Sequence, residues 1–126
     1  SYINTRSISK DGGISTFRSS VVITRNAPKS KAAVSCQSLM LDDISRSDTI
    51  PAMDIRTKDA NVGHEAKIGK ISDDAVFYLM SRGIPEEDAR AMIVSGFADN
   101  VSKELPLEYA VEMNNLIQLE MKGSIG

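Results

Sequence analysis

The stretch Asn61-Val-Gly-His-Glu-Ala-Lys-Ile-Gly-Lys-Ile-Ser-Asp-Asp-Ala-Val-Phe-Tyr-Leu-Met-Ser-Arg-Gly83 decides how this chain is organised, because the spacing of apolar residues changes within it. Before it, apolar and polar residues alternate in short runs, which is typical of half-buried strands. After it, apolar residues recur every three or four positions, as on the buried face of a helix. The stretch also holds the only histidine, His64, followed by Glu65. The sequence therefore predicts a β portion over residues 1–70 and a helical domain over residues 71–126.

The composition narrows the class of protein. A chain of 126 residues is long enough for a compact fold with a hydrophobic core. The net charge of −2, with no basic block, argues against nucleic-acid binding. No apolar run approaches 18 residues, so we expect no membrane span. A single cysteine cannot form an internal disulfide, which fits a reducing cytoplasm. The chain opens within a strand-like pattern and without an initiator Met, so we interpret it as part of a longer protein.

The strand-like segments follow one another at regular intervals. Their centres lie about 13–15 residues apart, and no segment with helical periodicity separates them. This spacing is compatible with a meander, a sandwich or the rungs of a β-solenoid, and it does not choose among them. Pro51 falls inside one segment, which indicates an edge strand or a bend there. The expected segments are residues 14–17, 20–25, 32–41, 49–56 and 62–68.

Three helices are expected after the junction. Ser72 can cap the first helix, and Gly83 can end it. Pro85 is expected at the first position of the second helix, and the third begins near Pro106 and ends at Gly123. The methionines of these segments lie at helical spacing and are expected in the core.

Cys36 and His64 are each unique in the chain and lie 64 − 36 = 28 residues apart. That gap is about two strand intervals, so on a solenoid the two residues would lie on the same side of neighbouring rungs, about 4.8 Å apart. Thiolate and imidazole suit iron, zinc and iron–sulfur clusters, and Glu65 could add an oxygen ligand. Other interpretations stay open: Cys36 as a small buried hydrophobe, His64 and Glu65 as a hydrogen-bonded pair, or a thiol hydrolase with His64 as base. No nucleophile elbow surrounds Cys36, which disfavours the hydrolase.

Several motifs together resemble one family. The runs Gly63-His-Glu-Ala, Lys70-Ile-Ser-Asp-Asp-Ala-Val-Phe-Tyr-Leu-Met-Ser-Arg-Gly-Ile and Ala91-Met-Ile-Val-Ser-Gly-Phe resemble the C-terminal end of the SufB/SufD proteins. Ser47-Asp-Thr-Ile-Pro51 and Leu105-Pro-Leu-Glu-Tyr109 are also similar to that family. These proteins are scaffolds of the SUF iron–sulfur cluster assembly system, and the resemblance runs from about Gly13 to the end of the chain.

The resemblance implies a fold and a set of partners. The fold would be mainly β with α: rungs of a right-handed parallel β-helix, followed by a small C-terminal helical domain. The partners would be the ABC-type ATPase SufC, docked on the helical domain, and SufD or a second SufB copy, paired through the β portion. Candidates for ATPase docking are Phe77, Tyr78, Arg82, Met92 and Phe97.

The resemblance also implies a site. Ser35-Cys36-Gln37-Ser38 matches the strand motif of the functional SufB cysteine, and His64-Glu65 matches its histidine–glutamate pair. SufD-like chains typically lack these residues, so the chain looks more like SufB. Gln37 stands where Asp is common, and Leu79 stands where one relative has Cys. One cysteine excludes four thiolate ligands from a single chain, so a transient iron–sulfur cluster would need ligands from a partner subunit or a second copy.

The sequence thus predicts the C-terminal part of a SufB-type scaffold, not itself an enzyme, in the cytoplasm or, in a plant, the plastid stroma. The alternatives are a purely structural SufD-like subunit and an unrelated thiol enzyme. Unpaired strand edges would favour a homodimer or larger assembly.

Overall fold

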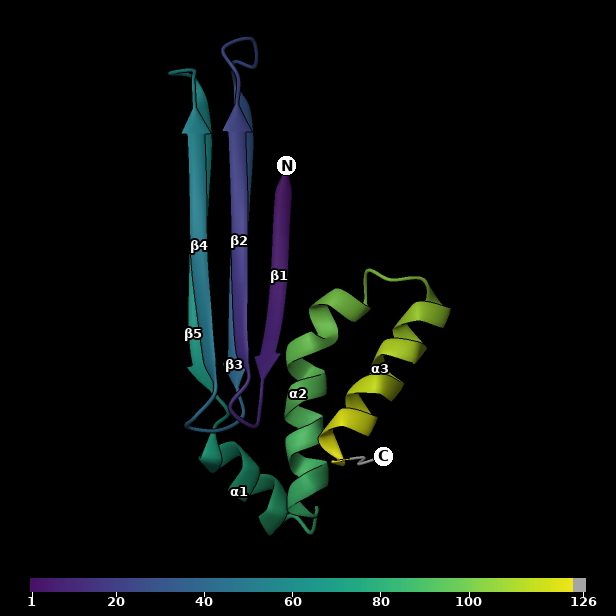
Figure 1. The fold of residues 1–126 in the computed structure, drawn as a ribbon. Coiled ribbons are helices and arrows are strands. Elements are labelled where there is room, and N and C mark those ends of the chain that lie inside the picture. Colours follow the sequence, from purple (N-terminus) through teal and green to yellow (C-terminus); the bar gives the residue numbers. More distant parts are fainter. Residues whose placement is uncertain (124–126) are drawn as a thin grey trace. The chain divides into compact units, whose positions relative to one another are not determined.

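The computed structural model describes residues 1–123, and the chain divides into two compact units. The first unit runs from Ser1 to Lys70 and holds the strands, and the second begins at Ile71 and holds the helices (Figure 1). Within residues 1–123, no helix is both long and apolar enough to cross a membrane.

The strands alternate between two parallel sheets along the chain. They are β1 (Tyr2–Ser9), β2 (Ile14–Ile23), β3 (Ser30–Met40), β4 (Arg46–Ile55) and β5 (Ala60–Lys70). One sheet has the order β1-β3-β5 and the other pairs β2 with β4. Figure 1 shows the strands of one sheet running opposite to those of the other, because each connection folds the chain back into the facing sheet.

The prediction of a right-handed parallel β-helix is wrong. The described residues form two small parallel sheets, of three and two strands, and with the three helices the chain is mixed α/β. Regular spacing tells where the chain turns back, but it does not tell how the strands pair or whether they close into a coil. The pattern of residues had left a sandwich open, and the resemblance alone had favoured the coil.

Single strands also differ from the prediction. The expected segments 14–17 and 20–25 form one continuous strand, β2, and β1 was not expected at all. Pro51 lies inside β4, opposite Ser19 of β2. Because proline has no N–H to donate, an outer strand of a sheet can hold it at little cost. β4 is such a strand in the described sheet.

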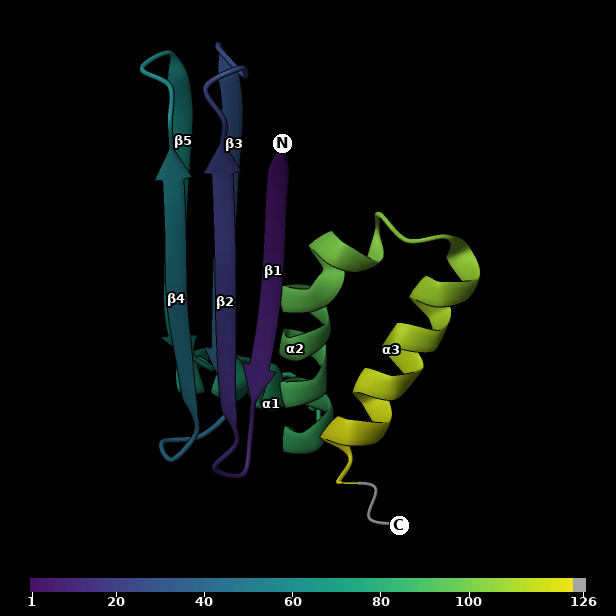
Figure 2. The same ribbon diagram turned by 45° about the horizontal axis from the view of Figure 1, so that its top comes forward.

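The two sheets face each other, and Figure 2 shows β2 and β4 in one layer with β3 and β5 behind it. At one end of the interface the side chains are apolar. Val21 and Ile23 of β2 and Val34 of β3 are buried there. The residues packed around them are Phe17, Ala27, Ala32, Ala60 and Val62. Alternate residues of each strand point inward, so a strand period of two builds this core.

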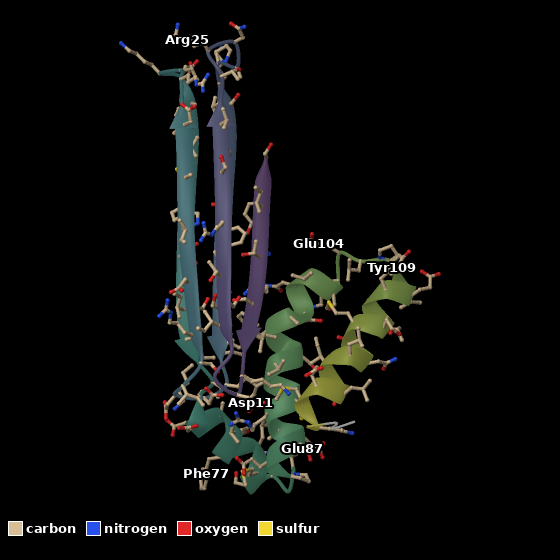
Figure 3. All side chains as sticks on the ribbon, viewed as in Figure 1. Asp11, Arg25, Phe77, Glu87, Glu104 and Tyr109 are labelled. Atoms are coloured by element: carbon tan, nitrogen blue, oxygen red, sulfur yellow. The ribbon has the colours of Figure 1, made fainter. Side chains whose placement is uncertain are left out.

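Two turns at one end of the strands are joined by Asp42. Its carboxylate accepts hydrogen bonds from the backbone N–H of Asp11 (2.6 Å), Ile44 (3.1 Å) and Ser45 (2.7 Å). Asp11 and Gly12 both have positive φ (55° and 78°), and Gly13 donates to the Lys10 carbonyl at 2.9 Å. Figure 3 shows Asp11 at this end of the strands. One carboxylate therefore fixes both the turn before β2 and the turn before β4.

The second unit holds α1 (Asp73–Ser81), α2 (Glu86–Ser102) and α3 (Leu107–Met121). The cap at Ser72 is confirmed, since its hydroxyl accepts from the Ala75 N–H at 3.2 Å. Gly83 follows α1 with φ 88°, a left-handed conformation that suits glycine. Pro85 caps α2 and lies one position before the helix, whereas it was expected as its first residue.

Small side chains form the centre of the helical unit. Its buried hydrophobic residues are Ile71, Val76, Ala89, Ala91, Val94 and Ala98. Among the described residues of α3 none is buried. The methionines do not form this core as expected, because Met80 and Met92 are exposed.

We expect Asp42→Asn to destabilise the protein, because an amide cannot accept from three N–H groups with both of its polar atoms. Hydrogen bonds from Ser45, together with those from Asp11 and Ile44, lower the pKa of Asp42 below its ordinary value of 3.8. A lowered pKa in the folded state adds stability above pH 3.8, and this contribution is lost as the pH falls through the folded-state pKa. Thermal unfolding from pH 7 to pH 2 should show a smaller acid-induced loss in Asp42→Asn than in the wild type.

The matched control is Asp43→Asn. Asp43 is the next residue and forms an exposed ion pair with Lys70, which is worth little. An equal loss of thermal stability at pH 7 in both variants would contradict the role given to Asp42.

Candidate functional site

The inward row of β3 holds Cys36 between two different environments. Val34, Cys36 and Ser38 are buried, and the cysteine is only 3% exposed. They lie two residues apart, so a strand places them on the same face. Towards Val34 the interface between the sheets is apolar, and towards Ser38 it is lined with hydroxyl groups. Cys36 lies at the boundary of the two regions.

His64 lies on the neighbouring strand, on the same face as Cys36. In the β3–β5 register His64 stands opposite Val34, and Cys36 stands opposite Ala66. The register offset of β3 and β5 is 30 residues, and the gap of 28 is two less, so the two residues share a face but lie diagonally. Standard strand spacings give a diagonal Cα separation of about 8 Å, within reach of a long or aromatic side chain.

The His64 ring has an uncommitted nitrogen. Its Nε2 atom is buried and has no hydrogen-bond partner within the described part of the chain. A buried polar atom without a partner is costly, and such atoms are uncommon in folded proteins. An imidazole nitrogen with a free lone pair is also what a metal ion needs from histidine.

Glu65 points to the other face of the sheet. It follows His64 directly in the strand, and it forms an exposed ion pair with Lys67 at 3.1 Å. A shallow hollow of about 270 Å³ has both His64 and Glu65 in its wall, together with Tyr2 and Ser35. Glu65 therefore does not meet Cys36 at the interface between the sheets, although it lies beside the same hollow as His64.

Hydroxyl groups cross the interface next to Cys36. Ser7 and Ser47 both donate to the Ser38 Oγ, at 2.7 and 2.6 Å. The Cys36 sulfur lies 3.5 Å from the Thr49 Oγ1, a hydrogen-bonding distance for sulfur. Ser47 and Thr49 belong to β4, so these contacts tie the two sheets together at the cysteine.

This arrangement supplies at most part of a metal site. Among residues 1–123, no group of three or more His, Cys, Asp and Glu side chains gathers closely enough to hold a metal ion. Cys36 and His64 together offer one sulfur and one nitrogen ligand, two of the four that an iron ion of a cluster requires.

The expected docking residues of the helical unit differ in exposure. Phe77 is 72% exposed, Met92 is exposed, and Phe97 is half-buried. Arg82 donates to the Tyr78 hydroxyl at 2.8 Å, and its guanidinium lies 5.0 Å from the centre of that ring. Exposed aromatic side chains of this kind are common at the centres of protein interfaces.

Sequence reasoning missed a second group of exposed apolar residues. They lie on α3 and are Leu107, Tyr109, Val111, Leu116 and Leu119. Figure 3 shows Phe77 on α1 and Tyr109 near the start of α3. The missed signal is that α3 has more apolar positions than one helix face can bury.

The outer strands of the two sheets are open. β5 ends one described sheet and β4 lies at the edge of the other. Met53 and Ile55 point to the inner face of β4 and Ile68 to that of β5, yet all three are exposed, Ile68 to 53%. Long edge strands with exposed apolar residues favour pairing with another chain.

Comparisons with known proteins agree on one family. Residues 1–97 match the family model described as "SUF system FeS cluster assembly, SufBD core domain". The chain is 51% identical to the iron-sulfur cluster assembly protein SufB of Bacillus subtilis and 51% identical to a SufBD family protein of Staphylococcus saprophyticus, over all of its 126 residues. It is 47% identical over the same length to a SufBD family protein of Mycobacterium leprae. The chain spans 27%, 27% and 14% of the lengths of these three relatives.

Proposed function

The chain belongs to the SufBD family of iron–sulfur cluster assembly proteins, and we propose that it is the C-terminal part of a SufB-type scaffold. The observation that carries the proposal is the placement of Cys36 and His64 on one face of adjacent strands. In this function the chain offers ligands to a nascent cluster and is not itself an enzyme. ATP hydrolysis belongs to the partner SufC.

Cys36 is the proposed sulfur ligand and His64 the proposed nitrogen ligand. A thiolate is the usual protein ligand of iron in clusters, and histidine replaces it in some of them. The buried and uncommitted Nε2 of His64 supports this role, because coordination of iron would give the atom the partner it lacks. The iron–sulfur cluster is cargo here, held for a time and then passed on.

Glu65 has a separate proposed role on the outer face. Its carboxylate stands beside the hollow that also reaches His64, and Fe²⁺ approaching through this hollow would meet a negative charge first. Oxygen ligands bind iron more weakly than thiolates, which suits an entry point better than a final site.

The remaining ligands are proposed to come from another chain. Cys36 and His64 provide two, and β5, which holds His64, ends the described sheet at an open edge. SufD or a second copy of this chain could therefore pair along β4 and β5 and bring its own side chains close to His64. The unpaired cysteine fits a reducing compartment such as the cytoplasm.

A second candidate is a purely structural SufD-like subunit. The burial of Cys36 favours it, because a sulfur that is 3% exposed behaves as a small hydrophobic side chain in most proteins. In that case the chain would pair with its partner and hold the ATPase without binding iron.

The helical unit is the proposed docking surface for SufC. The expected residues Phe77, Tyr78, Arg82, Met92 and Phe97 are joined in this proposal by the exposed apolar residues of α3. These side chains supply the aromatic and arginine contacts that dominate many interfaces.

Anaerobic reconstitution of the chain with Fe²⁺ and sulfide tests the scaffold. We expect a cluster signal in absorption and Mössbauer spectra that is lost in Cys36→Ser and reduced at least about tenfold in His64→Ala, since one of few ligands is removed in each case. Ser35→Ala is the matched control, because Ser35 adjoins Cys36 on β3 but points to the opposite face.

The same variants separate the two candidates. Equal cluster content in wild type, Cys36→Ser and Ser35→Ala would contradict the ligand role and favour the structural subunit. The measurement is repeated with the cognate SufD present, because the partner is proposed to complete the site.

Calorimetric titration with the cognate SufC tests the docking surface. We expect Phe77→Ser and Tyr109→Ser each to weaken binding about thirtyfold, the effect of losing an interface residue worth about 2 kcal/mol. Ile44→Ser is the control, since Ile44 is an exposed apolar residue of the strand unit. Unchanged affinity in both helical variants would rule out this surface.

Light scattering tests pairing through the strand edges. We expect the wild-type chain to be a dimer or larger, and Ile68→Lys to be monomeric, because a charge on the inner face of β5 opposes pairing of that edge. Val22→Lys, on the outer face of β2, should leave the assembly intact. A monodisperse wild-type monomer would refute the proposal.

A further inference from the structure

Thr49 is the residue of the facing sheet that meets the Cys36 sulfur. Its Oγ1 lies 3.5 Å from the Cys36 Sγ, and within residues 1–123 this is the one hydrogen bond recorded for that sulfur. Thr49 lies on β4, opposite Phe17 of β2, and is partly buried. We propose that Thr49 is a positioning residue, whose hydroxyl holds the sulfur of Cys36 in place and tunes it as a ligand. This proposal rests on the proposed function, because it assigns a partner to the ligand named there.

The geometry of the two strands supports a built contact. Cys36 meets Thr49, and two residues further along β3 Ser38 meets Ser47 at 2.6 Å. The residue numbers rise on one strand as they fall on the other, so the contacts are successive rows of one interface between the sheets. The serine pair therefore fixes the alignment that brings Thr49 to the cysteine.

The side chain of threonine suits this task. It branches at Cβ, which restricts χ1 and keeps the hydroxyl in one direction. A hydroxyl can both donate and accept. It can therefore accept from the S–H of a thiol, and it can donate to the sulfur after the proton has left and iron has bound. The contact is thus available to Cys36 both before and after iron is bound.

Hydrogen bonds to ligand sulfur atoms have known consequences. They shift the reduction potential of iron–sulfur clusters and orient the ligand. Changes to such outer partners typically cost about 10–100-fold in metal affinity. The partner of Cys36 comes from the opposite sheet, so the ligand is tied to the packing of the two sheets and not only to its own strand.

The first measurement uses the single cysteine of the chain. One cysteine gives one S–H stretching band in the Raman spectrum, and that band reports its hydrogen bond directly. We expect Thr49→Val, which removes the hydroxyl and keeps the branched shape, to shift the band to the position of a free thiol. Thr49→Ser keeps the hydroxyl and should leave the band near that of the wild type. An unchanged band in Thr49→Val would overturn the proposal, and circular dichroism shows whether each variant is folded.

The second measurement is anaerobic binding of Fe²⁺ and sulfide by the same variants. We expect about tenfold weaker iron binding in Thr49→Val and recovery in Thr49→Ser, as for other outer-shell partners. Normal binding in Thr49→Val, with binding lost in Cys36→Ser, would overturn the positioning role and leave the scaffold function standing. Normal binding in Cys36→Ser would instead overturn the scaffold function, and with it the positioning role, whatever the Raman band shows.

Discussion

The structure of the strand unit depends on β3, the only strand among the described residues that pairs on both sides. It joins β1 and β5 in one parallel sheet, and its inner face packs against β2 and β4. Because side chains alternate along a strand, one choice of register decides the environment of every second residue. A shift by one position would bring Ser35 and Gln37 inward and turn Cys36 out to solvent. The pairing of β3 therefore holds the fold and the cysteine in place together.

The interface between the sheets has two chemically different halves, and this difference matters for Cys36. Val21, Ile23 and Val34 stabilise one half by burying apolar surface. Ser7, Ser38 and Ser47 satisfy one another in the other half, so burial leaves these hydroxyls paired. A sulfur atom placed between them is kept from bulk water by the apolar half and reaches a hydroxyl on the polar side. Neither half alone would give it both.

The sequence allowed much of this to be predicted, and the failures have physical causes. Helix limits followed from Ser72, Gly83 and Pro106, because caps and glycines act locally. The pairing of strands is set by contacts between residues about 30 apart, so spacing could not reveal two sheets in place of a coil. Cys36 and His64 were expected on one side, and their common face follows from an even difference between gap and register. The partner Thr49 could not be foreseen, because it belongs to the opposite sheet and only packing brings it close.

The location of His64 on β5 carries the last step of the argument. A pair of ligands buried in the middle of a sheet can be completed only by the same chain, because neighbouring strands cover it. His64 instead lies on an outer strand of the described sheet, one strand away from Cys36. A second chain that pairs with β5 would place its own side chains in the next row of the same face, about 4.8 Å from His64. Strand pairing and completion of the ligand set would then be one event, so a cluster would be bound only in an assembled complex. A scaffold of this kind releases its cargo when the strand edges separate, which links cluster transfer to movements of the subunits and not to changes within this chain.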